Sequence, residues 1–209
     1  MSFSLNEMEA TAKRATRGAG YSWGLAEEAA KAARWLCVQG LDGSTDLARV
    51  LERRFSEHPA LHRPQTTAGV WHGKNDLCPL ASGALLSDCA QRLKDGPIEM
   101  RQVAAPLVLL PFVALAAKQL KHSVRVECDD VVAVTDGTNL DLQGTPPAVA
   151  QRVTVSICQE TAKPSRLLSR SHPAAQSWEA LNRFAHKTYA PATEESRALG
   201  AGSGLSDND

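Results

Sequence analysis

The apolar residues of this 209-residue chain change their spacing near its middle. Up to about residue 93 they recur every three or four positions, which places them on one face of an α-helix. From residue 123 to residue 157 they alternate with polar residues, as Val124, Val126 and Cys128 do, and this is the period of a strand with one buried face. Helices followed by strands predict an α+β fold: an N-terminal helical cluster, an antiparallel sheet of four or more strands and a C-terminal packing helix.

Capping residues mark where the first helices begin. Ser4 followed by Glu7 is a capping box, in which each side chain accepts a hydrogen bond from an otherwise unpaired backbone N–H. By the same reasoning Ser22 begins a second helix, and Ser44 or Thr45 begins a third. Three helices are therefore expected before residue 56.

Composition divides the chain into three parts. Residues 1–96 are expected to form a helical subdomain that buries Trp35 and carries a central loop over 56–79, where Pro, Gly, His and Asn accumulate. Residues 97–199 are expected to form the antiparallel sheet plus a helix, and residues 200–209 a glycine-rich tail. We expect the two subdomains to share one core.

Residues 80–120 contain one further predicted helix and one stretch whose pattern is ambiguous. A fourth helix is expected over about residues 80–93. The stretch 105–120 fits two interpretations, because its first half has the apolar character of a buried strand, whereas 112–120 is rich in alanine and fits a helix that begins after Pro111.

The balance of basic and acidic side chains limits the classes of partner that the chain is expected to bind. The chain carries 23 basic and 23 acidic side chains, so it has no net field to attract nucleic acid or an anionic membrane. Lys13, Arg14 and Arg17 form a small basic cluster, but no aromatic residue is interleaved with them in the sequence to stack on bases. We therefore expect no nucleic-acid partner and no membrane partner, and regard a homo-oligomer as possible.

Cysteine usage and the ends of the chain suggest a compartment. The five cysteines form no C-x-x-C pair, which suits a reducing environment where free thiols are small buried hydrophobes. The first residues lack the basic start and apolar run of a signal peptide. The longest apolar run, 103–117, is short for a membrane span and contains two prolines. These features predict a soluble cytoplasmic protein.

Cys78 is the best candidate for a catalytic thiol. It stands at a predicted helix start, where the helix dipole lowers a thiol pKa. His72 or His62 would then act as the base and Asp88 as the acid of a small cytosolic enzyme. The alternative is that Cys78 is an inert core residue, as most buried cysteines are.

Two further motifs give weaker evidence for a functional site. Gly20–Gly24 matches the G-x-S-x-G nucleophile elbow, but no apolar strand precedes it, so Ser22 is better explained as a helix cap. His58 and His62 have the i,i+4 spacing of metal ligands, but Pro59 leaves His58 outside the helical turn. We expect no metal and no cofactor.

The leading functional hypothesis is a binding or accessory protein for a small polar or anionic metabolite. It rests on the glycine-rich ends, the long central loop and the lack of a complete catalytic constellation. A pocket that brings together Arg17, Trp23 and Arg197 would favour this anion-binding function. Convergence of Cys78, a histidine and an acid would favour the enzyme, and an apolar patch with neither would favour a structural or oligomerisation module.

Short motifs at both ends of the chain, and one in the middle, are similar to motifs of a known protein family. The opening motifs are Ser4–Glu7, Arg17–Gly20, Trp23–Gly24, Ala26–Ala29 and Arg34–Leu36, the middle one is Leu77–Asp88, and the closing ones are Glu195–Arg197, Gly200–Gly202 and Asp207–Asp209. Together they resemble a family of uncharacterised bacterial proteins. The resemblance implies no activity, so it assigns no catalytic residue.

Overall fold

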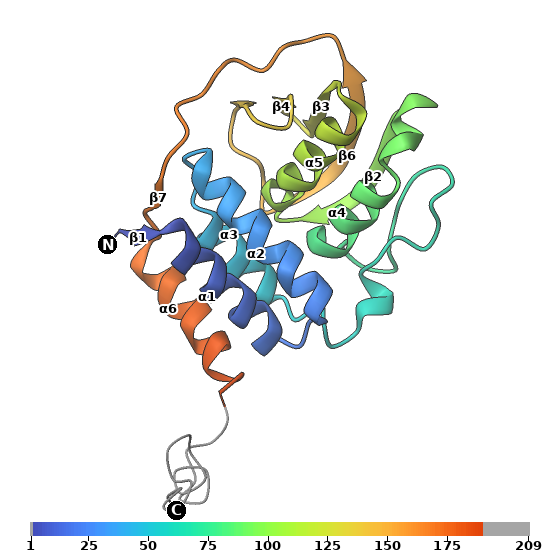
Figure 1. Cartoon of the computed structure of the whole chain (residues 1–209). Coiled ribbons are helices and arrows are strands. Elements are labelled where there is room, and N and C mark those ends of the chain that lie inside the picture. Colours follow the sequence, from blue (N-terminus) through green and yellow to red (C-terminus); the bar gives the residue numbers. More distant parts are fainter. Residues whose placement is uncertain (1, 190–209) are drawn as a thin grey trace, which may run out of the picture.

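The computed structural model describes residues 2–189 and consists of a helical layer packed against a sheet (Figure 1). The helical layer places α1 between α2 and α6, with α3 packed beside α2 and α6. Its helices are α1 (Leu5–Gly18), α2 (Trp23–Val38), α3 (Gly43–Glu52) and α6 (Ala175–His186). The expected C-terminal helix therefore completes the N-terminal cluster by packing against α1.

The sheet has five antiparallel strands in the order β2-β6-β3-β4-β5. The strands are β2 (Ile98–Ala104), β3 (Ser123–Cys128), β4 (Val131–Thr135), β5 (Leu140–Gln143) and β6 (Val149–Cys158). In β3 the alternating residues Val124, Val126 and Cys128 are buried, as their spacing predicted. A separate two-residue pair joins β1 (Phe3–Ser4) to β7 (Arg170–Ser171). The predicted α+β fold is confirmed.

Two remaining helices, α4 (Pro79–Asp88) and α5 (Leu110–Leu120), connect the layers. Most buried residues of α5 belong to the sheet-side core cluster, whereas its Phe112 belongs to the helical cluster. Helix α4 packs against α2 and α5. Both core clusters thus include residues of α5, which lies between the helices and the sheet.

Side-chain caps begin the first helices. Ser4 accepts a hydrogen bond from the Glu7 backbone N–H at 3.1 Å, and Ser22 accepts one from Leu25 N–H at 3.3 Å, so both residues are confirmed as helix caps. Only the Ser4 half of the predicted capping box forms, since the Glu7 side chain makes no hydrogen bond to the Ser4 backbone N–H. Helix α3 is capped by Asp42 rather than by Ser44 or Thr45. Asp42 was missed because the two hydroxyl residues that follow it compete for the same role.

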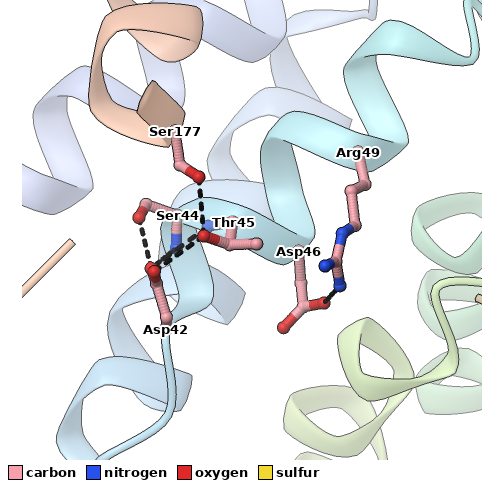
Figure 2. Close-up of polar contacts among 6 residues, drawn as sticks. All are labelled: Asp42, Ser44, Thr45, Asp46, Arg49 and Ser177. Atoms are coloured by element: carbon pink, nitrogen blue, oxygen red, sulfur yellow. Dashed lines mark hydrogen bonds and ion pairs between the residues drawn. The ribbon is translucent and has the colours of Figure 1, made fainter. Parts of the chain in front are cut away.

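A polar cluster joins the beginnings of α3 and α6 (Figure 2). The Asp42 carboxylate accepts hydrogen bonds from the backbone N–H groups of Ser44 and Thr45, both at 3.1 Å. The Thr45 hydroxyl also lies 2.6 Å from the Ser177 hydroxyl of α6. One carboxylate therefore serves both as a helix cap and as part of a link between distant segments.

Several boundaries differ from the predictions. The expected strand after residue 105 is wrong: Pro106–Leu109 is a 3-10 helix, and the strand is the preceding β2. Pro106 and Pro111 lack the N–H groups that a ladder needs, and Ala105 adopts a left-handed conformation with φ 41. The helical part, expected over 112–120, is confirmed as α5. The fourth helix ends at Asp88 and continues only as a short 3-10 turn.

The position of Trp35 differs from the prediction that it is buried within the helical subdomain. It is partly buried, and it packs against the sheet-side cluster rather than within the helical cluster. It lines a small cavity between α2 and α5 together with Pro111 and Leu115 of α5. Trp35 therefore lies on the side of α2 that faces α5, and spacing within α2 alone does not distinguish the two apolar faces.

Candidate functional site

A cavity of about 180 Å³ lies where the α1–α2 turn, the segment after α3 and the start of α4 meet. We call it the Cys78 pocket. Its lining residues are Gly20, Tyr21, Ser22, Leu25, Phe55, Ser56, Pro59, His62, Cys78 and Ala81. The pocket is therefore built from three segments that are well separated in the sequence.

Helix caps and turns place the polar side chains of the pocket. Gly20 has φ 95, a left-handed conformation that favours glycine, and the turn it makes directs Tyr21 into the core, where it is 5% exposed. Cys78 is the residue before α4, and Pro79 occupies the first helical position, where a missing N–H costs nothing. The Cys78 backbone N–H donates to the His62 carbonyl oxygen at 2.8 Å, so the central loop is fastened to α4 beside the pocket.

The Tyr21 hydroxyl and the Cys78 thiol touch inside the pocket. Their Oη and Sγ atoms are 3.7 Å apart, and either can be the donor. Burial raises the pKa of the Cys78 thiol, against the opposing effect of hydrogen bonds with the Ala81 amide, the Tyr21 hydroxyl and the Leu80 amide. Burial, and then the thiol itself, raises the pKa of Tyr21 above its ordinary value. Both groups are therefore uncharged at neutral pH.

His62 is oriented by the backbone. Its Nδ1 lies 2.8 Å from the carbonyl oxygen of Asp76, which can only accept, so Nδ1 donates and the lone pair of the neutral ring is on Nε2. The ring also packs against Phe55, with centroids 4.6 Å apart, and the Asp76 carboxylate pairs with Arg53. These contacts hold the ring in one orientation. A backbone carbonyl has no sequence signature, so this role of Asp76 was not predictable.

The structure does not bring the predicted trio of Cys78, His72 and Asp88 together. His72 is exposed, and its Nδ1 lies 3.4 Å from the Gly73 carbonyl oxygen. Asp88 is exposed at the other end of α4, roughly 15 Å from Cys78 at 1.5 Å per helical residue. Among the histidines that were considered as a base, His62 is the one that shares a pocket with Cys78.

Two of the three predicted ligand-binding residues do lie together. The guanidinium carbon of Arg17 is 5.0 Å from the centroid of the Trp23 ring, and Arg17 Nη1 donates to the Tyr21 carbonyl oxygen at 2.5 Å. Neither residue lines the Cys78 pocket. Arg197 and the predicted tail at 200–209 lie outside the described residues.

A wider cleft of about 860 Å³ adjoins the Cys78 pocket. The two share Leu25 and Ala81. The cleft is otherwise bordered by the loop residues Arg63–Thr67 and by the side of α4 that ends at Asp88.

Residues 2–189 contain neither a group of metal-ligating side chains nor a helix that could span a membrane. No group of three or more His, Cys, Asp or Glu side chains in this part of the chain is arranged to hold a metal ion. His58 precedes the 3-10 turn Pro59–Leu61 and is exposed. No helix in the same range is long and apolar enough to cross a membrane.

Comparison with known proteins relates the first part of the chain to a protein family. Residues 3–82 match a family model described as "Protein of unknown function (DUF3726)". No curated protein and no solved structure matches the chain. The match confirms the resemblance to an uncharacterised family over residues 3–82, whereas the closing motifs at 195–209 lie outside the matched segment. Every residue that lines the Cys78 pocket lies within this segment.

Proposed function

We propose that this protein binds a small uncharged molecule, about the size of one six-membered ring, in the Cys78 pocket. The observation that carries the proposal is the pocket volume of about 180 Å³ together with its lining. An apolar cavity of about 150 Å³ holds one benzene molecule. The Cys78 pocket is therefore of the right size for a single ring with a small substituent.

The polar groups of the pocket favour a ligand with one hydroxyl or amide. Tyr21 Oη and Cys78 Sγ lie together, and the Nε2 lone pair of His62 is available to accept a hydrogen bond. Among residues 2–189, no Asp, Glu, Lys or Arg side chain lines the pocket, so a charged ligand would lose hydration without gaining an ionic partner there. The anionic ligand expected from the sequence is thus poorly suited to this pocket.

Thermal melts with defined probes test the proposal. Phenol, benzyl alcohol and benzamide should raise the melting temperature with increasing concentration, because a ligand that binds only the native state stabilises it by mass action. Benzoate, which is similar in size but charged, should raise it less. Tyr21→Phe should weaken the effect of phenol more than that of toluene, since only phenol uses the Tyr21 hydroxyl.

A pair of matched variants locates the binding. Ala81→Leu adds volume inside the pocket and should abolish the rise in melting temperature, whereas Ala84→Leu, on the same helix, borders only the adjoining cleft and should preserve it. The proposal fails if none of the uncharged probes changes the melting temperature of the wild-type protein. It also fails if Ala81→Leu folds and retains the full response.

One observation favours a second function, thiol chemistry at Cys78. His62 lines the same pocket as the thiol, and the Asp76 carbonyl oxygen holds its Nδ1. Nε2 is therefore the ring atom that would accept the thiol proton while the sulfur adds to a carbonyl carbon and the carbonyl electron pair moves to the oxygen. Burial, however, raises the pKa of Cys78. If this function holds, iodoacetamide should modify Cys78 faster than free cysteine, and His62→Gln should remove that advantage.

A further inference from the structure

We propose that the exposed side of α1 binds single-stranded nucleic acid. The surface, here called the α1 face, consists of Lys13, Arg14, Arg17, Trp23 and Tyr189. The cations come from the last two turns of α1, whereas the aromatic residues come from the start of α2 and from the segment after α6. The proposal is independent of the Cys78 pocket.

Each aromatic ring of the α1 face lies against a cation. The Trp23 ring has Arg17 at 5.0 Å and Lys13 at 5.9 Å from its centroid. The Tyr189 ring has the Arg14 guanidinium at 5.9 Å, and Arg14 Nη1 donates to the Tyr189 hydroxyl at 3.1 Å. These contacts orient both rings on the protein surface.

Both rings remain open to solvent. Trp23 is 60% exposed and Tyr189 is 53% exposed, which is high for such large apolar side chains. Exposed aromatic rings stack on nucleic-acid bases of any sequence, because every base has a π face. The two rings are therefore suited to hold two bases.

The arginines between the rings retain capacity for phosphate. Arg14 and Arg17 make no ion pair within residues 2–189, whereas Lys13 is paired with Glu27 at 2.7 Å. A guanidinium has five N–H donors, and the guanidinium of each arginine makes only one hydrogen bond among these residues. They are three residues apart on α1, so they are neighbours on the helix surface. Phosphate between two stacked bases would meet both.

The combination of two exposed aromatic rings with two adjacent arginines favours nucleic acid over an acidic peptide as the partner. A peptide carboxylate would use the arginines but would leave the two ring faces without a matching flat partner. The sequence predicted no nucleic-acid partner for two reasons. The first is the zero net charge of the chain, and the second is that no aromatic residue stands among the cations of residues 13–17. Folding places the rings of Trp23 and Tyr189 beside these cations, so the second reason no longer holds.

Fluorescence anisotropy tests the proposal with the full chain. The probes are labelled oligothymidine and oligouridine of about 10 nucleotides, at about 50 mM salt. Binding should weaken as salt rises, with a log–log slope of about −1.4 if the two arginines neutralise two phosphates of a single strand. Trp23→Ala and Tyr189→Ala should each lower the affinity by about tenfold, in line with loss of one stacked base.

Charge-matched variants supply the control. The double variant Arg14→Gln with Arg17→Gln should lower the affinity at least about tenfold, because both phosphate contacts are lost. The double variant Lys74→Gln with Arg166→Gln removes the same charge from exposed positions outside the α1 face and should change the affinity less than about twofold. Cooperative melting of each variant shows that it is folded.

Three results would overturn the proposal. The first is absence of binding to either oligonucleotide by the wild-type protein at low salt. The second is equal loss of affinity in the two charge-matched double variants, which would indicate nonspecific attraction. The third is tight binding of a polyglutamate peptide that the aromatic substitutions do not weaken, which would indicate an acidic protein partner instead.

Discussion

The carboxylate of Asp42 accepts a hydrogen bond at 3.1 Å from the backbone N–H of Ala174, the residue before α6. The two residues are 132 positions apart. The same carboxylate caps α3 through Ser44 and Thr45 (Figure 2). The start of the C-terminal helix is thereby attached to the helical cluster that it completes.

Asp42→Ala should destabilise the protein by about 2 kcal/mol, the upper range for a lost helix cap, because the link to α6 is lost as well. Asp42→Asn keeps an acceptor oxygen and should cost less. Urea denaturation at neutral pH measures both changes. Equal stability of the Ala variant and the wild type would show that the cap and the link contribute nothing.

The pH dependence of this contribution has a definite sign. Burial acts to raise the pKa of Asp42, but hydrogen bonds from Ser44, Thr45 and Ala174 outweigh it and lower the pKa. A lowered folded-state pKa contributes stability above the unfolded-state value of about 3.9, and this is lost as the pH falls through the folded-state value. The difference between wild type and Asp42→Ala should therefore shrink on acidification below pH about 4.

Asp46 should behave in the opposite way. It is buried in α3, and burial raises its pKa, against the partial compensation by Arg49. A raised folded-state pKa means that the stabilising contribution is complete only below pH about 3.9 and is lost as the pH rises through the folded-state value. Asp46→Asn should therefore leave the protein equally stable or up to about 1 kcal/mol more stable at pH 7. Destabilisation at pH 7 with recovery in acid would contradict this.

Local and distant contacts explain what the sequence could predict. The caps at Ser4 and Ser22 depend on residues three positions away, so they are visible in the sequence. The contacts between Tyr21 and Cys78, and between Asp42 and Ala174, join segments that the fold brings together. Spacing therefore predicted the fold class and most elements, but it could not predict the lining of the Cys78 pocket.

β2 was missed for a local reason. Ile98 and Met100 follow the strand period, but Gln102 has φ 51 and is not among the residues of β2 paired with β6. The following apolar residue, Val103, is therefore out of phase with the first two. On the outer edge of β2, Trp71 and Leu77 of the central loop form parallel bridges, and these stabilise a strand that its own sequence pattern only weakly indicates.

Thiol reactivity should follow burial. Cys37, Cys78 and Cys128 are buried, whereas Cys89 and Cys158 are only partly buried. Burial raises the pKa of Cys37 to about 11 and that of Cys128 to about 12. At pH about 8, N-ethylmaleimide should therefore modify Cys89 and Cys158 first, and the three buried thiols only after urea is added. Mass spectrometry of digested protein identifies the sites, and early modification of Cys78 would favour the thiol function instead.

Trp35→Ala should cost less than the loss of a fully buried aromatic residue. Truncation of a fully buried ring costs about 3–5 kcal/mol, but Trp35 is only partly buried at the α2–α5 interface. A loss of about 2 kcal/mol is expected from denaturant titration. Phe112→Ala serves as the fully buried comparison on the facing helix, and a larger loss for Trp35→Ala than for Phe112→Ala would show that the interface depends chiefly on Trp35.

Two serines of α4 provide a matched test of buried hydroxyl groups. The Ser82 hydroxyl is fully buried and has no hydrogen-bond partner among the described residues. The Ser87 hydroxyl is also buried, but it lies 3.2 Å from the Gly83 carbonyl oxygen and 3.4 Å from that of Phe112. Burial of a polar group without a hydrogen-bond partner destabilises the folded state by the free energy of desolvation. A hydrogen bond to a buried group offsets this cost.

The two alanine variants should therefore differ in sign. Ser82→Ala removes an unpaired hydroxyl and should leave stability unchanged or raise it by up to about 1 kcal/mol, whereas Ser87→Ala should lower it by about 1 kcal/mol. Both changes replace serine by a better helix former, so helix propensity cancels in the comparison. Urea titrations of the two variants measure the difference, and a Ser82→Ala variant less stable than Ser87→Ala would show that the Ser82 hydroxyl has a partner after all.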